Sequence, residues 1–389
     1  MTAEAIAGQD SFDVAVAGGG IVGCACALAC ARRGLRVVLV ERDVLGSGAT
    51  AAGMGHIVVM DDSEAQFALT RSSQELWRRL ELPAGAEYVE TGTLWVAADG
   101  EEMEAAERKY TSYREHGVPC RILTARELAE AEPQLVRGLA GGLLVPEDAV
   151  VYPAVVALEL ARRAEALGAE IVVGRAVKAM GHGILLLEGG AEIRAGRLVL
   201  ALGAEAAAVM PELPVRKRKG HLAITDRYPG FVRHQLVELG YLKSAHGSEA
   251  DSVAFNVQPR QTGQLLIGSS RQYGDESSRV DARILGAMLE RAAVYMPAIG
   301  GMNAIRVWTG FRAATPDKLP LIGPTADDET VWLATGHEGL GITTSLMTAE
   351  LVAAGLTGGE APIAPEAYLP GRLVAASRAK TNELPASAS

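Results

Sequence analysis

The sequence predicts an α/β protein in which a domain on a parallel sheet is interleaved with an α+β domain built on an antiparallel sheet. The first observation is an apolar strand that runs into a glycine-rich turn and an alanine-rich helix near the N-terminus. The second is that strand-to-glycine patterns return near residues 200 and 335, so distant segments build one domain. The third is that the stretches between them hold short β-branched runs, typical of a separate sheet.

Size and composition exclude several classes of protein. The 389 residues are 49% hydrophobic, enough for one large core or two domains. No apolar run reaches the ~18 uncharged residues of a membrane span, and residues 1–11 lack the features of a signal peptide. A formal net charge of −10 disfavours a nucleic-acid binder. We therefore expect a cytoplasmic protein, with peripheral attachment to the inner membrane left open, and loose tails at 1–11 and 375–389.

The four cysteines do not form a metal-binding pattern. Cys24, Cys26 and Cys30 lie in one predicted helix, and Cys120 stands alone. None forms a Cys-x-x-Cys pair, and no histidine lies at ligand spacing from them. We expect small buried thiols in a reducing compartment, and no metal or iron–sulfur site in this chain.

The N-terminal region has the order strand, glycine turn, helix, strand. Phe12–Ala17 is a short apolar run typical of a buried parallel strand. The alanine-rich run Cys24–Arg33 predicts a helix, and glycine follows it. A second strand, Arg36–Val40, ends on Glu41. This order is the beginning of a parallel βαβ unit.

The turn between strand and helix reads Gly18-Gly19-Gly20-Ile21-Val22-Gly23. Gly18 permits the tight turn, Gly20 lets a pyrophosphate approach the backbone, and Gly23 lets the helix pack close to the sheet. The first helical turn, with Ile21 and Val22, offers N–H groups and a partial positive charge to phosphates.

An acid at the end of the second strand completes the motif. The Glu41 carboxylate can accept hydrogen bonds from both ribose hydroxyls and would repel a 2′-phosphate, so an NADP site is disfavoured. Because turn, helix, strand and acid are in register, the sequence predicts a dinucleotide site. The motif alone does not distinguish FAD from NAD.

Further segments carry a resemblance to a known family. They are Gly46–Met54 (GSGATAAGM), Arg197–Ala204 (RLVLALGA), Gly310–Gly323 (GFRAATPDKLPLIG) and Leu333–Ile342 (LATGHEGLGI). They resemble the D-amino-acid oxidase/glycine oxidase family of flavoproteins, over roughly residues 12–370. The resemblance implies a Rossmann-like FAD-binding domain of the glutathione-reductase type, with an interleaved α+β substrate domain. An NAD enzyme with one such unit stays open, although no second glycine motif serves a nicotinamide.

The resemblance also implies how FAD is held. The final helix, expected over about Thr343–Ala354, points its N-terminus at the flavin edge that carries negative charge when reduced. The place of the histidine that some relatives link to FAD holds Thr50, and no cysteine follows Cys120, so a non-covalent cofactor is expected. The positions expected to bind FAD are Gly18, Gly20, Ile21, Val22, Gly23, Glu41, Arg42, Ala49, Thr50, Ala51, Gly53, Met54, Val177, Ala201, Gly203, Gly310, Arg312, His337, Glu338, Gly339, Leu340, Gly341 and Ile342.

The resemblance divides the chain into two domains. Residues 12–87, 147–214 and 309–370 are expected to form the FAD-binding domain, and residues 88–146 and 215–308 the substrate-binding domain. The strand-like runs expected in the second domain include Thr93–Ala97, Ser252–Val257 and Gln264–Gly268.

Arg312 is the leading candidate for contact with the substrate. In the family, the matching arginine binds the substrate carboxylate in a bidentate manner, since only arginine offers two parallel N–H donors with a permanent charge. The alternative is an arginine that only packs against the sheet.

Two further residues are candidates for the catalytic site. Gly339 stands where glycine oxidases have a second arginine, and Glu338 precedes it. An acid there suits an amine or ammonium substrate, and a surface position is the equal alternative. His56 follows the glycine loop, either over the flavin or in a structural role. Weaker candidates for the pocket wall are His221, Tyr241, Arg271 and Gln272.

The basic run Arg216–Lys219 has two interpretations. A solvated loop after Pro214 is favoured, and a patch facing a partner or an acidic substrate is the alternative.

The stretch Arg218–Arg271 and the loop GHEGLGITTS resemble one branch of the family, the FAD-binding β-subunit of D-hydroxyproline dehydrogenases and opine oxidoreductases. That branch implies oxidation of an amino or cyclic imino acid by hydride transfer from Cα to flavin N5, giving an imine. It also implies partner subunits with iron–sulfur or second flavin centres. A 2-hydroxy-acid dehydrogenase, and an FAD-carrying subunit active only in a hetero-oligomer, are the alternatives; the electron acceptor stays open.

Overall fold

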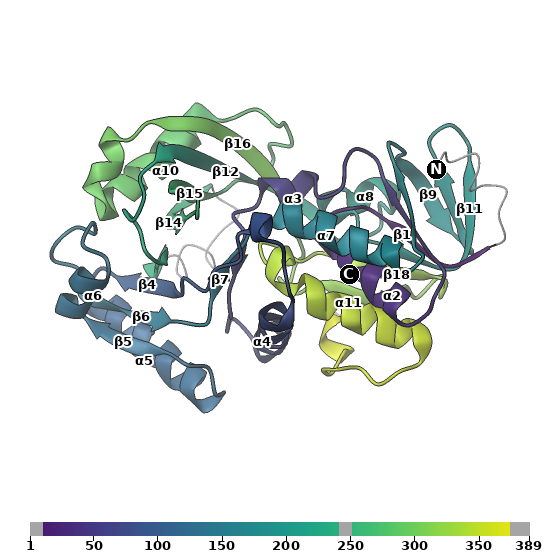
Figure 1. Ribbon diagram of the computed structural model, residues 1–389, viewed down its shortest axis with the longest axis horizontal. Helices are drawn as coiled ribbons and strands as arrows, with labels where there is room; N and C mark the ends of the chain where they lie inside the picture. The colour runs from purple at the N-terminus through teal and green to yellow at the C-terminus, as the bar shows by residue number, and fades with distance from the viewer. Residues whose placement is uncertain (1–10, 241–250, 374–389) are drawn as a thin grey trace, which may run out of the picture.

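The computed structural model describes residues 11–240 and 251–373. Its strands form two large sheets of eight strands each, which lie in different halves of the molecule (Figure 1). A third, two-stranded sheet consists of β3 (His56–Ile57) and β7 (Ala149–Val150), which pair antiparallel. The expected α/β architecture, with an antiparallel second sheet, is confirmed.

The first sheet is mainly parallel. β1 is its central strand and pairs in parallel with β2 on one side and β11 on the other, while β17 and β18 pair antiparallel at one edge. Its path runs β17 (Leu321–Pro324), β18 (Val331–Thr335), β11 (Glu192–Leu200), β1 (Phe12–Ala17), β2 (Val37–Glu41) and β8 (Glu170–Val173), with β9 (Val177–Gly181) and β10 (Ile184–Leu187) attached through β11.

Alternate side chains of β1 enter two different cores. Val14 and Val16 pack with α2 (Ile21–Arg32), α7 (Pro153–Ala166) and α11 (Gly341–Thr357) on one face. Ala15 and Ala17 belong to the core on the other face, with side chains of β9–β11. A strand buried on both faces explains why the sequence of β1 is apolar without alternation.

The second sheet is antiparallel except for the parallel pair β4–β13. Helix α10 (Ala282–Tyr295) packs against β14 and β15, and α5 (Gly100–Glu115) and α6 (Ala125–Ala131) pack against β4–β6. The strand order is β16 (Ala304–Ala314), β12 (Arg216–Arg227), β15 (Gln264–Arg271), β14 (Ser252–Pro259), β13 (Gln235–Glu238), β4 (Thr93–Ala97), β6 (Gly141–Val145) and β5 (Arg121–Thr124).

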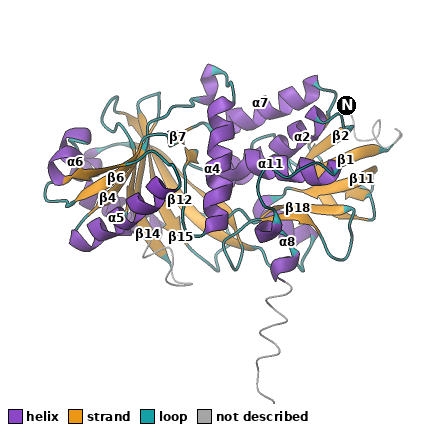
Figure 2. Cartoon of the chain, turned by 90° about the horizontal axis from the view of Figure 1, so that it is seen from below, coloured by secondary structure: helices purple, strands orange, loops and turns teal. Residues whose placement is uncertain are grey.

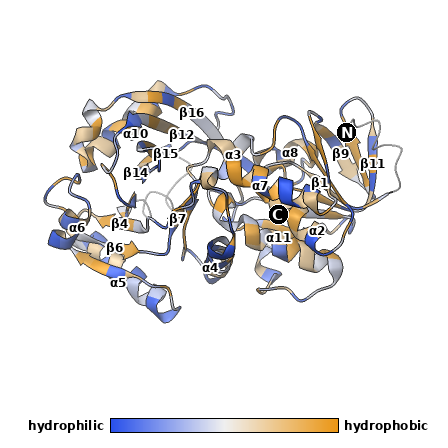
Figure 3. Ribbon diagram, in the orientation of Figure 1, coloured by the Kyte–Doolittle hydropathy of each residue, from blue (hydrophilic) through white to orange (hydrophobic). Residues whose placement is uncertain are grey.

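Helix α4 (Glu64–Arg79) lies between the strands of the two sheets (Figure 2). Its Trp77 indole nitrogen donates to the Thr343 carbonyl at 2.9 Å, which ties it to the start of α11. The hydropathy colouring agrees with this placement, since α11 is mostly apolar and α4 carries polar segments (Figure 3). Short helices at α3 (Gly48–Ala52) and α8 (Ala206–Val209) follow β2 and β11.

The local predictions agree closely with these elements. The runs at Phe12–Ala17 and Thr93–Ala97 are strands with the expected bounds. The final helix is longer than expected, because α11 begins at Gly341 and ends at Thr357. The interpretation of residues 216–219 as a solvated loop is wrong, since they form the beginning of β12.

Candidate functional site

A cavity of about 880 Å³ is lined by residues of both large sheets. Its wall includes the turn after β1, the end of β2, and the loop around α3. β9, β12, β16 and the loop before α11 complete it. Segments more than three hundred residues apart in the chain therefore meet at one site.

The glycine turn forms one part of this wall. At Gly23 an added Cβ would lie 1.8 Å from the Gly18 carbonyl oxygen, so α2 packs against the strand at a distance that only glycine permits. Gly18 has a φ of 106°, a conformation that favours glycine. Gly20 at the start of α2 has no side chain to cap the helix, and the Ile21 N–H donates to the Thr50 hydroxyl at 3.0 Å. The partial positive end of α2 thus faces the cavity.

The Glu41 carboxylate is held at the edge of the turn. It accepts hydrogen bonds from the Gly19 amide at 2.7 Å and the Asp43 amide at 2.8 Å, and the residue is buried. These two amides fix the direction of the carboxylate at the end of β2. Its place beside the turn fits the ribose of a dinucleotide.

A second helix N-terminus reaches the cavity from the other end of the chain. Gly341 and Ile342 begin α11, which no side chain caps, and both line the cavity. The loop before it is fixed to β16 because the Glu338 amide donates to the Ala313 carbonyl at 2.9 Å. In the same loop His337 bonds Thr348 at 3.0 Å, and burial lowers the pKa of His337 to about 4.

Nearly every position expected to bind the cofactor lies in the cavity wall. The exceptions are Gly23, which packs beneath the turn, and Ala51, which is exposed. The three catalytic candidates Arg312, Glu338 and His56 also line the cavity.

Arg312 extends from β16 across its neighbouring strands. One guanidinium nitrogen, Nη1, donates to the Ser270 carbonyl at 2.9 Å. The guanidinium lies directly over Gly220, where an added Cβ would be 2.5 Å from Nη1. Gly339 lies on another side of the guanidinium, where an added Cβ would be 3.5 Å from Arg312 Nε. Two glycines thus leave the space that this arginine occupies.

The basic run is part of the site wall. Arg218 and Lys219 are buried on β12, and Arg218 is paired in register with Arg312 on β16. The Arg218 guanidinium forms an ion pair with the Glu338 carboxylate. Lys219 forms an ion pair with Asp275 at 2.7 Å. Buried cations require such partners, and both acids are distant in sequence.

Glu338 is therefore not a surface residue. Its side chain is 11% exposed, and its charge is matched by Arg218. The signal that could have corrected the loop interpretation was the apolar run GHLAIT at residues 220–225, which continues the basic run as one strand.

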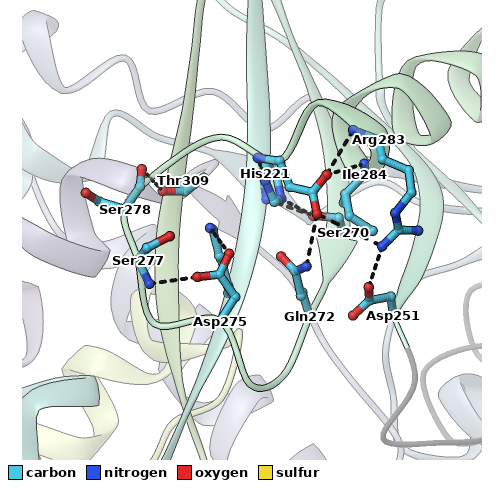
Figure 4. A network of polar contacts seen from close by, with 12 residues as sticks. His221, Asp251, Ser270, Gln272, Asp275, Ser277, Ser278, Arg283, Ile284 and Thr309 are labelled. Atoms are coloured by element: carbon cyan, nitrogen blue, oxygen red, sulfur yellow. Dashed lines mark hydrogen bonds and ion pairs between the residues drawn. The ribbon is translucent and has the colours of Figure 1, made fainter.

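A polar network surrounds Ser270, the residue whose carbonyl accepts from Arg312 (Figure 4). The backbone N and Nδ1 of His221 lie 2.8 and 2.9 Å from the Ser270 hydroxyl. His221 Nε2 accepts from the Asp281 amide at 3.0 Å, so the ring proton is on Nδ1. Asp281 in turn caps α10. The network fixes the residue whose carbonyl receives Arg312.

The weaker candidates have different outcomes. His221 and Arg271 line the cavity, whereas Gln272 does not and instead donates to Asp281 at 3.2 Å. Tyr241 lies outside the described residues. Sequence reasoning missed further wall residues from the second sheet, which include Trp95, Arg218, Asn256 and Ser269.

The cysteines lie away from this chemistry. Cys24, Cys26 and Cys30 are buried free thiols in α2, and burial raises the pKa of Cys24 and Cys30 to about 12. Within residues 11–240 and 251–373, no three His, Cys, Asp or Glu side chains are placed to hold a metal ion. In the same ranges, no helix has the length and apolar character needed to cross a bilayer.

Comparison with known proteins decides the family. The family model described as FAD dependent oxidoreductase matches residues 13–354. The chain belongs to this family. The resemblance inferred from the sequence is thereby confirmed at the level of the family, and FAD is the cofactor that the family uses.

Individual relatives agree with this assignment. A glycine oxidase of Geobacillus kaustophilus is 30% identical over 361 residues, covering 88% of this chain and 92% of that protein. A D-amino acid dehydrogenase of Neisseria meningitidis serogroup C is 28% identical over 309 residues, covering 75% and 70%. The crystal structure of the Geobacillus kaustophilus glycine oxidase matches with a TM-score of 0.84 at 28% identity, over 93% and 98% of the two chains. The L-proline dehydrogenase of P. horikoshii shares the fold, with a TM-score of 0.85 at 24% identity and coverage of 95% and 99%.

The residues of this chain fit FAD. The N-termini of two helices, α2 and α11, reach one cavity from opposite ends of the chain. One such end can bind the phosphates of a dinucleotide, and the other can stabilise negative charge on its ring system. Glu41 and the small residues of the α3 loop complete the wall for the ribose and the flavin.

Proposed function

We propose that this protein oxidises a small amino or cyclic imino acid at Cα, with Arg312 as the group that binds the substrate carboxylate. The observation that carries the proposal is the place of Arg312 in the cavity wall, between two glycines and bonded to the Ser270 carbonyl. A guanidinium can bind a carboxylate through two parallel N–H donors, which fixes the orientation of the bound group. Oxidation of an amino acid is also the activity that the names of the glycine oxidase and D-amino acid dehydrogenase relatives give.

The side chains of the cavity orient the substrate. When bound, FAD supplies N5 as the acceptor of the hydride that leaves Cα, and the oxidised product is an imine. The chain holds this cofactor through the N–H groups at the start of α2 and through Glu41. Arg312 fixes the substrate carboxylate, which leaves one direction for Cα–H, and this orientation is the main contribution of the protein.

The substrate is proposed to carry a secondary amine of the hydroxyproline type. The stretch from Arg218 to Arg271, which carries the resemblance to D-hydroxyproline dehydrogenases, supplies two arginines of the cavity wall, Arg218 and Arg271. The ion pair of Arg218 with Glu338 places no net charge beside the substrate nitrogen. A secondary amine whose carboxylate is bound at Arg312 fits this wall.

We further propose that FAD is bound without a covalent link. Among the described residues that line the cavity none is a cysteine. Thr50 occupies the position considered for a linking histidine, and its hydroxyl accepts from the Ile21 amide.

Partner subunits belong to the same proposal. A relative named hydrogen cyanide synthase subunit HcnC, from Pseudomonas aeruginosa, is 28% identical and covers 88% of this chain. Its name supports a chain of this kind working inside an assembly. Turnover of the purified chain with an artificial electron acceptor would show that substrate oxidation does not need a partner.

The test is anaerobic reduction of the flavin by candidate substrates. Glycine, D-alanine, D-proline, D-hydroxyproline and lactate are mixed with the FAD-loaded chain, and loss of the visible flavin absorbance is followed. We expect reduction by the cyclic amino acids and none by lactate; reduction by lactate alone would overturn the proposal.

The variant Arg312→Met tests the carboxylate contact. We expect KM to rise by roughly 100-fold, because a charge-assisted bidentate contact is lost, while FAD stays bound. Arg306→Met is the matched control, since Arg306 is exposed on the same strand. An unchanged KM in Arg312→Met would contradict the assignment.

A further inference from the structure

A chain of hydrogen-bonding groups leads from the cavity wall into the core. His56 lines the cavity on β3, and its Nε2 lies 2.6 Å from the Thr93 hydroxyl at the start of β4. The Thr93 side chain also lies beside the Asp148 carboxyl and favours its charged form, and Asp148 Oδ2 is buried without a hydrogen-bond partner among the described residues. Thr93 is fully buried and Asp148 is 1% exposed, so only His56 of the three reaches the cavity.

The directions of these hydrogen bonds are fixed by the donors around Asp148. Its Oδ1 accepts from the Gln74 amide group at 2.8 Å and from the Val59 amide at 3.2 Å. An ionised carboxylate only accepts, so the single Thr93 proton is the one available to the unpartnered Oδ2 of Asp148. Thr93 then accepts from His56, whose ring proton is on Nε2. His56 Nδ1 therefore holds a lone pair, and within the described residues nothing donates to it.

Burial shifts the pKa values of His56 and Asp148, the two ends of this row of hydrogen-bonding groups, in opposite directions. Burial lowers the pKa of His56 to about 3, so the imidazole does not keep an added proton by itself. Burial raises the pKa of Asp148 to about 7, against the opposing hydrogen bonds and the charge of Lys109. A proton is thus held more readily at Asp148 than at His56.

The other charged and titratable groups near Asp148 have partners or stay neutral. Lys109 forms an ion pair with Asp61. Glu147, the preceding residue, is paired with Arg71 at 3.0 Å and with Arg78 at 2.9 Å. The two phenols that interact electrostatically with Asp148, of Tyr88 and Tyr113, have raised pKa values because they are desolvated by burial.

We propose that His56, Thr93 and Asp148 form a proton relay that removes the proton from the substrate ammonium group before oxidation. The inference rests on the proposed amino-acid oxidation, which needs a neutral nitrogen whose lone pair can form the imine. One N–H bond of the ammonium breaks, its electron pair stays on nitrogen, and the proton binds His56 Nδ1. The Nε2 proton passes to the Thr93 oxygen, and the Thr93 proton passes to the Asp148 carboxylate.

The charges balance without a buried imidazolium. Before transfer the substrate nitrogen is positive and Asp148 is negative; afterwards both are neutral. His56 ends as the other neutral tautomer, and Thr93 regains its proton. After the product leaves, the proton returns by the same route, which restores the starting protonation states of His56, Thr93 and Asp148. The protein thus needs no strong base in the cavity.

The experiment measures anaerobic flavin reduction by D-proline in rapid mixing, across pH, with the FAD-loaded chain. Thr93→Val and Asp148→Asn interrupt the relay with little change of shape, and Thr93→Ser restores the hydroxyl. Thr225→Val is the matched control, because Thr225 is a buried threonine of the same sheet that does not line the cavity.

For the wild type we expect the rate to fall as pH drops below about 7, since protonated Asp148 accepts no proton. In Thr93→Val and Asp148→Asn the rate at neutral pH should fall by about 100-fold, the usual size of general-base catalysis. It should recover at alkaline pH, where the free amine is already neutral. Thr93→Ser and Thr225→Val should keep the wild-type profile.

A loss of equal size at every pH, or no loss, would overturn the relay. A readout independent of activity is NMR of isotope-labelled histidine, which should show the Nε2–H tautomer of His56 in the wild type and its loss in Thr93→Val. If D-proline and the other amino acids do not reduce wild-type flavin at any pH, the proposed function fails instead. The NMR result then still decides whether the hydrogen-bonded chain exists.

Discussion

Two walls of the cavity differ in what holds them together. The glycine wall consists of Gly18, Gly20 and Glu41, which line the cavity, with Gly23 packed beneath the turn, all within one βαβ unit. The arginine wall consists of Arg218, Arg271 and Arg312 on three neighbouring strands. The first wall depends on close backbone packing between residues near in sequence. The second depends on charges whose partners are distant in sequence. A local motif therefore identifies the glycine wall but not the ion pairs of the arginine wall.

The largest effect is expected where the glycine wall is broken. In Gly23→Val the new side chain would meet the Gly18 carbonyl, which is backbone and cannot move aside. We expect loss of about 3 kcal/mol or more of folding stability and loss of bound FAD. Thermal unfolding and the flavin-to-protein absorbance ratio measure both.

Gly286→Ala is the matched control for this change. Gly286 also lies within a helix, α10, but an added Cβ would meet nothing within 4 Å. Alanine there should stabilise the protein by about 0.5–1 kcal/mol and leave the FAD content unchanged. A Gly23→Val protein with normal stability and full FAD would mean that close packing does not determine the glycine wall.

A second test separates the arginine wall from the glycine wall. Arg218→Met leaves the Glu338 carboxylate buried without its ion-pair partner, and a loss of about 3 kcal/mol of stability is expected. The double variant Arg218→Met/Glu338→Gln should recover most of this loss, because no charge remains buried. Chemical unfolding of both proteins, with FAD content as a second readout, gives the comparison. Equal losses in the single and double variants would show that the pair contributes by shape and not by charge.

The same contrast explains which features the sequence could predict. The turn, Glu41 and the strands at Phe12–Ala17 and Thr93–Ala97 depend on local patterns, and they have the expected positions. The basic run was misinterpreted because its neutralising acids, Glu338 and Asp275, are near only in the folded chain.

Residues outside any motif show the limit more clearly. Arg312 was identified through a resemblance, but nothing local indicates that Gly220 leaves space for it. Thr93 and Asp148 have ordinary neighbours in sequence, and only the pairing of β3 with β7 brings His56 near them. Contacts between strands far apart in the chain determine these parts of the site.

The smallest effect, and the sharpest comparison, is expected from Gly220→Ala. The new methyl group would lie 2.5 Å from Arg312 Nη1, the end of a flexible side chain, so the guanidinium can shift at little cost to folding. A displaced guanidinium binds the substrate carboxylate less well, and we expect KM to rise by about 10-fold with unchanged FAD content. Steady-state kinetics measures the change in KM, and thermal unfolding measures the cost to folding.

Gly300→Ala is the control, because that glycine lies in the short helix Pro297–Gly301, where an added Cβ meets nothing within 4 Å. Its KM should equal that of the wild type. If Gly220→Ala lost FAD instead of raising KM, the two walls would not be independent. If KM stayed the same, Arg312 would not bind the carboxylate from the position that Gly220 opens. An increase in KM alone would show that one methyl group disturbs the arginine wall and leaves the glycine wall intact.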